Sequence, residues 1–403
     1  MEVTKFFPIA NDRMGELWTL ASIKDACVIE FGPAGTTHFA IDGLGTLNAP
    51  QEGAKIYSTH MDQDDVTFGK YDRLENAILE LDINVKPKYI FVMASSISSI
   101  IGADIESVCF DLESKVNAKL ILMTSGGLKD HYHVGVENML ETIVKNIVQE
   151  KAPNLNKYNI LGMTIDRYNF ASDVEEIKRM MYGLYTKEVN TVFTCDTSID
   201  EIENAAEAGL NIVVRREALK AALYMKEKFG IPYVYTNFYG LENIEKFVGA
   251  VNEIHGYELN ETFYQREIGQ IHKHLFTVKR SFFMYKESKK CAIFGDYDTV
   301  IGMRDLITEL GLEIDRSEVL YKTNVDEGMF SGTTEMTKMK YLKNADLLFL
   351  FGDGNLHSMN HQAKGYLQIS NPNFERRLLY PYTPFIGFRG MQYMMEQLLN
   401  IKL

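Results

Sequence analysis

The sequence predicts an α/β protein built from three Rossmann-like domains, each with a doubly wound parallel sheet. Two observations carry this prediction. Short apolar runs alternate with helix-length segments from one end of the chain to the other, and the runs are almost continuously apolar. Continuous apolar character is typical of strands that are buried on both faces of a parallel sheet. The chain length of 403 residues fits two or three domains of roughly 100–200 residues each.

The expected elements fall into three groups along the chain. The first group ends near Pro153, and its strands are expected at 26–29, 88–94 and 120–124. The second runs from Lys157 to about Glu258, with strands expected at 158–164, 191–195, 211–214 and 233–236. A polar, aromatic helical stretch over 264–289 leads into the third, with strands expected at 291–294, 346–351 and 366–369. Because a repeated strand–helix order builds parallel sheets, we expect one α/β domain in each of 1–155, 156–260 and 261–403.

The charge balance of the chain excludes some partners. It has 42 Lys and Arg against 55 Asp and Glu, which gives a net charge of −13. A field of this sign repels phosphate backbones and anionic membranes, so we expect neither nucleic acid nor a membrane as a partner. No apolar run approaches the roughly 20 residues that span a bilayer, and residues 1–8 lack the features of a secretory signal. We therefore expect a cytoplasmic protein.

The four cysteines are isolated from one another in the sequence. No zinc-type spacing of Cys or His connects Cys27, Cys109, Cys195 and Cys291. Cysteines of this kind most often act as small buried hydrophobic residues.

The loops that follow the strands hold the first candidate site residues, because ligands of open parallel sheets bind beyond the carboxyl ends of the strands. Gly32 and Gly35 precede His38 and suit either an anion or cofactor cradle or a tight strand-to-helix turn. Ser96 belongs to a serine cluster after the run 88–94, which suits either a polar ligand or helix capping. His133, two residues after His131, suits either a ligand-binding loop or a solvated one.

Two further pairs of residues follow expected strands. Arg215 and Arg216 suit either an acidic group of a ligand or pairing with local carboxylates, since an unpaired buried guanidinium is costly. His357 and His361 have i, i+4 spacing, which places both imidazoles on one helix face and suits metal ligands; a polar face at a helix N-terminus is the alternative. Neither a Gly-x-Ser-x-Gly elbow nor a Gly-x-Gly-x-x-Gly fingerprint is present, so a plain nicotinamide-dinucleotide site is unsupported.

Several motifs, taken in order, resemble the nitrogenase component 1 type proteins. Ile23-Lys24-Asp25 and Phe31-Gly32-Pro33-Ala34-Gly35-Thr36 resemble the family's Ile-Lys-Asp and His-Gly-Pro-x-Gly-Cys segments. Further similar segments lie at 58–69, 100–108, 225–232, 237–240 and 387–390, so the resemblance covers nearly the whole chain. The family includes the nitrogenase molybdenum-iron protein subunits, their cofactor-assembly scaffold and the catalytic component of dark-operative protochlorophyllide reductase.

The resemblance also indicates what this chain lacks. The family's shared cluster is ligated by three cysteines on each subunit, and the corresponding positions here hold Ala10, Thr36 and Ser96. The family's cofactor-ligating Cys corresponds to the neighbourhood of Val214, and its cofactor-ligating His to 374–382, where no His is found. Because Fe–S clusters are held by thiolates, we expect no Fe–S cluster ligated by this chain's cysteines.

By resemblance, the three domains surround a central cleft that forms the family's cofactor cavity. The resemblance implies that loops lining this cleft supply the cofactor-binding residues His38, His133, Arg216, His357, His361, Gly32, Gly35 and Ser96. His357 and His361 are the expected metal ligands. The expected ligand is a metallocofactor or an anionic tetrapyrrole-like molecule, and its identity is left open.

Three functions remain open from the sequence. The first is an oxidoreductase subunit that binds this ligand and receives electrons from an ATP-dependent iron protein through a paralogous subunit. The second is a non-enzymatic binding or carrier protein for a metal complex or small anion, and the third is a structural pseudo-subunit of a hetero-oligomer. We expect the chain to pair with itself or with a paralogue through a face that carries Phe31, Phe39, Ile97, Ile100 and Ile101.

Overall fold

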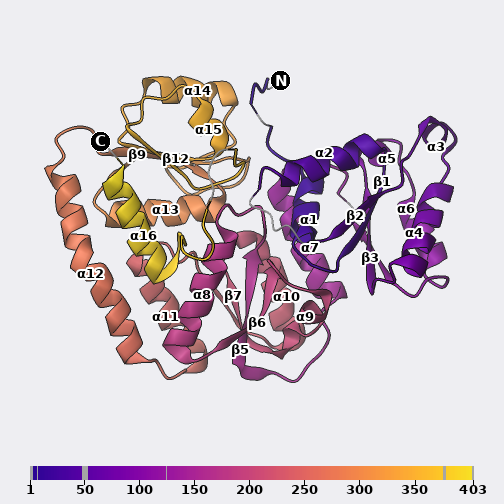
Figure 1. The fold of residues 1–403 in the computed structure, drawn as a ribbon, viewed down its shortest axis with the longest axis horizontal. Helices are drawn as coiled ribbons and strands as arrows, with labels where there is room; N and C mark the ends of the chain where they lie inside the picture. Colours follow the sequence, from indigo (N-terminus) through magenta and orange to yellow (C-terminus); the bar gives the residue numbers. More distant parts are fainter. Residues whose placement is uncertain (1–2, 7, 48–52, 124, 375–377, 402–403) are drawn as a thin grey trace.

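The computed structural model describes residues 3–6, 8–47, 53–123, 125–374 and 378–401. Its strands form three separate parallel sheets, one after another along the chain, with helices packed against them (Figure 1). The strand orders are β2-β1-β3-β4, β6-β5-β7-β8 and β11-β10-β9-β12-β13. The predicted α/β fold class with three parallel sheets is confirmed.

The first sheet is covered on both faces. Its strands are β1 (Cys27–Phe31), β2 (Lys55–Ser58), β3 (Tyr89–Ala94) and β4 (Lys119–Met123). Alternate residues of a strand point to opposite faces, so Ile29 packs toward α4 (Asp72–Asn84) and α6 (Ile105–Leu112), whereas Val28 packs toward α1 (Asp12–Ala21) and α7 (Tyr132–Asn146). Further helices follow β1, β2 and β3, namely α2 (Ala34–Leu44), α3 (Gln63–Phe68) and α5 (Ser96–Ile100).

The second sheet shares a buried apolar core with the first and third units. Its strands are β5 (Asn154–Met163), β6 (Glu188–Thr194), β7 (Ala208–Val213) and β8 (Tyr233–Tyr235). Apolar residues of all three units belong to one buried cluster, so the units pack directly on one another. The helices are α8 (Phe170–Tyr185), α9 (Ile199–Glu203), α10 (Leu219–Phe229) and α11 (Gly240–His255), with 3-10 turns at Ala205–Glu207 and Arg216–Ala218.

The third sheet follows a long helix, α12 (Glu261–Met284), which buries one stripe of apolar side chains at helical spacing. Its strands are β9 (Lys290–Gly295), β10 (Glu313–Val319), β11 (Phe330–Ser331), β12 (Phe349–Gly352) and β13 (Gly365–Gln368). The remaining helices are α13 (Tyr297–Glu309), α14 (Glu335–Asn344), α15 (Gly354–Ser358) and α16 (Gly387–Asn400). Helix α16 packs against α8, α11 and α12, which ties the end of the chain to the second unit.

Strand β10 is a strand that apolar patterning did not predict. Its sequence, EIDRSEV, is polar, yet its last four residues are buried. Arg316 and Glu318 lie on the same face of the strand and pair at 2.6 Å, so each charge compensates the other inside the sheet. Charge pairing therefore allows a buried strand without an apolar sequence. The short strands β2 and β11 were also not predicted.

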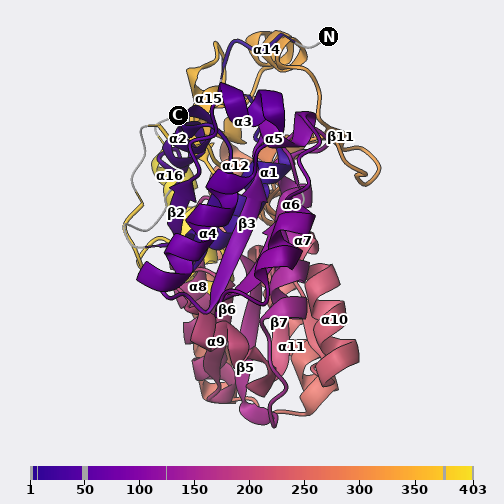
Figure 2. The ribbon, with the colours of Figure 1, turned by 90° about the vertical axis from the view of Figure 1, so that its right-hand side faces the viewer.

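The three units surround a junction through which the N-terminal segment passes. In Figure 1 the first unit lies at the right, the second below and the third at the upper left, and the chain enters between the first and third units. The view turned by 90° shows the same order, with the second unit below the other two (Figure 2). Among the described residues, no helix is both long and apolar enough to cross a bilayer.

The face that we expected to pair with another subunit is only partly exposed. Phe31 is 1% exposed because it ends the buried strand β1, so its assignment to that face was wrong. Phe39 on α2 is 55% exposed and Ile100 on α5 is 69% exposed, with Ile101 exposed beside it. Ile97 is half-buried against the core of the first unit.

Candidate functional site

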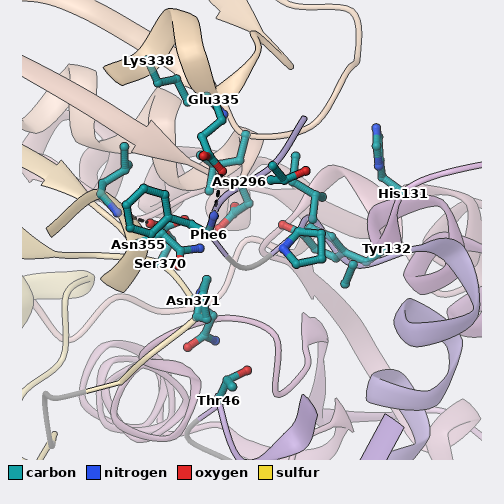
Figure 3. Close-up of a pocket in the computed structure, with 18 of the residues that line it drawn as sticks. Phe6, Thr46, His131, Tyr132, Asp296, Glu335, Lys338, Asn355, Ser370 and Asn371 are labelled. Carbon is teal, nitrogen blue, oxygen red and sulfur yellow. Dashed lines mark hydrogen bonds between the residues drawn. The ribbon is translucent and has the colours of Figure 1, made fainter. Parts of the chain in front are cut away.

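A cavity of about 230 Å³ lies where strand ends of the second and third sheets meet the helices of the first unit (Figure 3). The third unit contributes Asp296 after β9, Asp353 after β12 and Ser370 after β13. The second contributes Asp166 after β5, and the first contributes Tyr132 at the start of α7. The carboxyl ends of parallel strands are where ligands of such sheets bind, so this cavity is the candidate functional site.

The N-terminal segment forms one wall of the cavity. Phe6 lies centrally among Asp296, Glu335, Asn355 and Ser370 in Figure 3. The two oxygens of the Glu335 carboxylate accept hydrogen bonds from the backbone N–H groups of Lys5 (2.9 Å) and Phe6 (3.2 Å). These bonds fasten the segment before α1 to the first turn of α14, so the segment joins the third unit to the first.

Two carboxylates of the cavity cap helices. Asp296 precedes α13 and accepts hydrogen bonds from the N–H (3.1 Å) and hydroxyl (2.7 Å) of Thr299. Asp353 precedes α15 and accepts from the N–H of Leu356 at 2.8 Å. Burial raises the pKa of Asp353 to about 6, and the helix N–H groups only partly oppose this effect. The N-terminal positions of both helices are thus filled by the protein's own carboxylates.

A buried ionic network lies behind the cavity. Arg215, which is fully buried, donates to Asp166 (2.8 Å) and to Glu217 (2.9 Å). Tyr321 of the third unit donates to the other oxygen of Glu217 at 3.0 Å. Arg167 lies 3.8 Å from Asp296. Of the two interpretations of Arg215 left open by the sequence, pairing with local carboxylates is the one that the structure shows.

His133 and Arg216, two of the predicted site residues, both lie beside Tyr321. The His133 ring is stacked on the Tyr321 ring at 3.9 Å, and burial lowers the pKa of His133 to about 4. The Arg216 guanidinium lies 3.9 Å from the ring centre of Tyr297 and donates to Thr323 at 2.6 Å. Neither residue lines the described part of the cavity, whereas the neighbouring His131 does, although its side chain points away from Phe6 in Figure 3.

His357 and His361 lie close to each other but outside the cavity lining. Helix α15 ends at Ser358, where Met359 turns to extended backbone, so the prediction that one helix face carries both imidazoles was wrong. Their ring centres are still 6.4 Å apart, and the His357 ring is stacked on Tyr366 at 4.4 Å. The described cavity lining includes neither imidazole. Their role as metal ligands stays a prediction.

The remaining predicted site residues lie in the first unit. His38 is exposed on α2 and lies 3.4 Å from Asp42. Gly32 passes so close to Ser95 that an added Cβ would lie 2.4 Å from the serine Cβ, which explains the glycine by packing. Gly35 faces open space. Ser96 lies against Gly127, whose carbonyl accepts a hydrogen bond from Asn11.

Several cavity residues were not among the predicted site residues. Asp296 and Ser370 lie within two residues of the ends of predicted strands, so the strand-end rule contained a signal for both. Trp18 lines the cavity from the middle of α1, and Lys338 lines it from α14. Nothing local in the sequence distinguishes Trp18 and Lys338 from other core or helix residues.

A family model described as nitrogenase component 1 type oxidoreductase matches residues 12–402. The chain belongs to the nitrogenase component 1 type oxidoreductase family. The predicted resemblance is confirmed by a match over nearly the whole chain.

Relatives within this family include proteins named for cofactor biosynthesis. The nitrogenase iron-molybdenum cofactor biosynthesis protein NifE of Clostridium pasteurianum is 31% identical over 245 residues, covering 59% of this chain and 52% of that protein. NifE of Methanosarcina barkeri is 27% identical over 361 residues (82% and 76%), and NifN of Bradyrhizobium diazoefficiens is 22% identical over 426 residues (96% and 87%). The matches to several NifE proteins span only about half of their length.

A solved nitrogenase structure shares the fold. Nitrogenase Cp1 at pH 6.5 superimposes with a TM-score of 0.80 and covers 100% of this chain and 94% of its own, at 16% sequence identity. This similarity supports the three-sheet architecture and carries no statement about activity.

The residues present do not fit a metallocofactor of the family held by protein ligands. Cys27, Cys109, Cys195 and Cys291 are all buried and unlinked, and none lines the described cavity. Burial raises the pKa of Cys27 and Cys109 to about 11 and that of Cys195 and Cys291 to about 12, which keeps the thiols neutral. Within the described ranges, no three His, Cys, Asp or Glu side chains are grouped closely enough to hold a metal ion.

Proposed function

We propose that this chain is a ligand-binding subunit of a nitrogenase component 1 type assembly. It holds a small molecule or a preformed complex in the central cavity and ligates no Fe–S cluster itself. The observation that carries the proposal is the cavity lining, where polar side chains from all three units converge and, in the described part, no thiolate is present. Ligand binding then depends on hydrogen bonds, charge and shape.

The relatives support a holding role. Their names place them in the biosynthesis of a cofactor, and a protein that assembles or transfers a cofactor has to bind it reversibly. In the redox form of the proposal, electrons come from an ATP-dependent iron protein through clusters on a paralogous subunit. Ala10, Thr36 and Ser96 replace the family's cluster-ligating cysteines, so this chain contributes no thiolate to that path.

Iron analysis of anaerobically purified protein tests this proposal. The chain is purified alone and after co-expression with a paralogous component 1 chain, and iron content and the visible absorption spectrum are measured on both. We expect no stoichiometric iron and no Fe–S absorption from the chain alone, and iron in the co-purified complex in the amount that the paralogue's cysteines can ligate. A stoichiometric Fe–S cluster on the isolated chain would overturn the proposal.

A further inference from the structure

We propose that the central cavity takes a small organic cation, rather than the anionic ligand expected from the sequence. The inference rests on the proposed function, since it names the class of ligand for the same cavity. Three independent properties of the lining lead to it: its charge, the occupation of its helix N-termini, and its aromatic side chains.

The charge of the lining favours a cation. Among the described residues, four carboxylates contribute to it, those of Asp166, Asp296, Glu335 and Asp353, against one ammonium group, that of Lys338. Buried arginines behind the cavity compensate Asp166 and Asp296. Lys338 in turn lies 3.5 Å from the buried carboxylate of Glu318. Glu318 is also paired with Arg316, so Lys338 compensates part of the charge of Asp353 as well. Among the described residues Glu335 forms no ion pair and is bonded to backbone N–H groups alone. The described lining therefore keeps an excess of negative charge, which attracts positive charge in a poorly solvated cavity.

The positions that suit an anion are already occupied. Anions bind at helix N-termini because backbone N–H groups point out there and the helix dipole is positive at that end. At α13 and α15 the side chains of Asp296 and Asp353 accept these N–H groups. At α14 the hydroxyl of Thr334 does so. A negatively charged ligand would meet carboxylates at α13 and α15 and a filled cap at α14.

Aromatic side chains complete the lining. Phe6, Trp18 and Tyr132 line the cavity, and the Trp18 and Tyr132 ring centres are 5.5 Å apart. Aromatic faces attract ammonium groups, and clusters of them recognise quaternary ammonium ions. Trp18 is 6% exposed, and its indole N–H has no hydrogen-bond partner in the described structure. The indole N–H is itself buried, so the contact that Trp18 offers to a ligand is aromatic surface.

Three molecules of one shape and different charge test the inference. Choline is the cationic probe, 3,3-dimethylbutan-1-ol is its uncharged carbon analogue, and 3,3-dimethylbutanoate is an anionic analogue. Binding to the full chain is measured at pH 7.5 by ligand-observed NMR. We expect choline to bind at least tenfold more tightly than the alcohol, and the carboxylate to bind no better than the alcohol.

Matched aspartate variants assign the binding to the cavity. Asp353→Asn removes one charge but keeps a good N-cap residue, and it should weaken choline binding at least fivefold without changing the affinity for the alcohol. Asp296→Asn makes the same change at the N-cap of α13. It is used in place of Asp353→Asn if the Asp353 variant does not fold. Asp104→Asn is the control, because Asp104 caps α6 outside the cavity in the same way.

The outcomes separate this inference from the proposed function. If 3,3-dimethylbutanoate binds more tightly than choline, and this binding is lost in the cavity variants, the inference of a cationic ligand is wrong. The proposed function as a ligand-binding subunit would still hold. Equal affinity for all three probes, or no binding of any of them, would also contradict the inference that the cavity takes a cation. The iron analysis judges the proposed function independently of these results.

Discussion

Glu16 is a buried carboxyl group whose environment is unfavourable for its charge. It lies on α1, 2% exposed, and one of its oxygens accepts a hydrogen bond from the Ser125 hydroxyl at 2.7 Å. The other oxygen has no partner in the described structure. Burial therefore raises the pKa of Glu16 to about 7. The folded protein holds this proton more tightly than the unfolded chain does.

We predict that Glu16→Gln becomes more stable than the parent protein as pH rises. In the parent, the contribution of Glu16 to the free energy of unfolding falls between pH 4.5, its ordinary pKa, and about pH 7. The variant has no such group, so the difference in its favour should grow by up to about 3 kcal/mol over that window and stay level above it. Denaturant unfolding at pH 5, 6, 7 and 8 measures this.

Glu113→Gln, a change at an exposed carboxylate, is the control for the loss of one surface charge. A difference between Glu16→Gln and the parent that does not change with pH would contradict the assignment of the raised pKa to Glu16.

At the residue scale, the sequence indicated which side chains could bind a charged group, but not which groups they contact. The sequence left open whether Arg215 and Arg216 bind an acidic ligand group or pair with local carboxylates, and the resemblance assigned Arg216 alone to the cleft. In the structure Arg216 and His133 both lie beside Tyr321. Arg215 instead turns inward to Asp166, which lies far from it in the sequence. Because the choice between a ligand and an internal partner depends on long-range packing, spacing along the chain cannot decide it.

At the scale of single elements, the end of α15 separates the predicted histidine pair from the cavity. Asp353 caps a helix of only five residues, and the chain leaves helical geometry at Met359. His357 and His361 consequently pack beside Tyr366 instead of facing Phe6. Strand β10 is an element that the sequence did not predict. It is buried without an apolar run, because Arg316 and Glu318 pair inside the sheet.

We predict that the double variant His357→Ala/His361→Ala binds choline within twofold of the parent protein, because neither imidazole lines the described cavity. The stability cost should be about 1 kcal/mol or less, since His357 is exposed. Ligand-observed NMR and thermal unfolding measure the two effects, and Zn²⁺ titration of the parent and the variant tests the predicted metal role. A loss of choline binding would show that the pair contributes to the cavity after all.

At the scale of the whole molecule, the parallel sheets followed from the sequence because most of the buried strands, β10 excepted, are almost continuous apolar runs. The position of the cavity could also be predicted in part, because ligands of parallel sheets bind beyond the carboxyl ends of the strands. The wall that the N-terminal segment forms in the cavity could not be predicted from the sequence. It depends on hydrogen bonds between Glu335 and backbone groups at Lys5 and Phe6, more than three hundred residues away.

We predict that the chain does not act as a lone monomer and pairs through the exposed part of the face around α2 and α5. Phe39, Ile100 and Ile101 form an exposed apolar group there, which is costly to leave in water. Ile100→Asp should convert the assembly to monomers without loss of stability, because Ile100 is 69% exposed. Light scattering at increasing protein concentration measures this. A parent protein that stays monomeric at high micromolar concentration would contradict the self-pairing form of the prediction.

The central claim, that the cavity holds a ligand without a cluster ligated by this chain, is tested most directly by native mass spectrometry. The anaerobically purified chain is compared with Ser370→Phe, which fills the cavity from the buried position after β13, and circular dichroism checks that the variant is folded. We predict an extra mass on the parent protein that is released on denaturation, contains no iron and is absent from the folded variant. A parent protein of bare chain mass, or an adduct with the mass of an iron–sulfur cluster, would contradict the account.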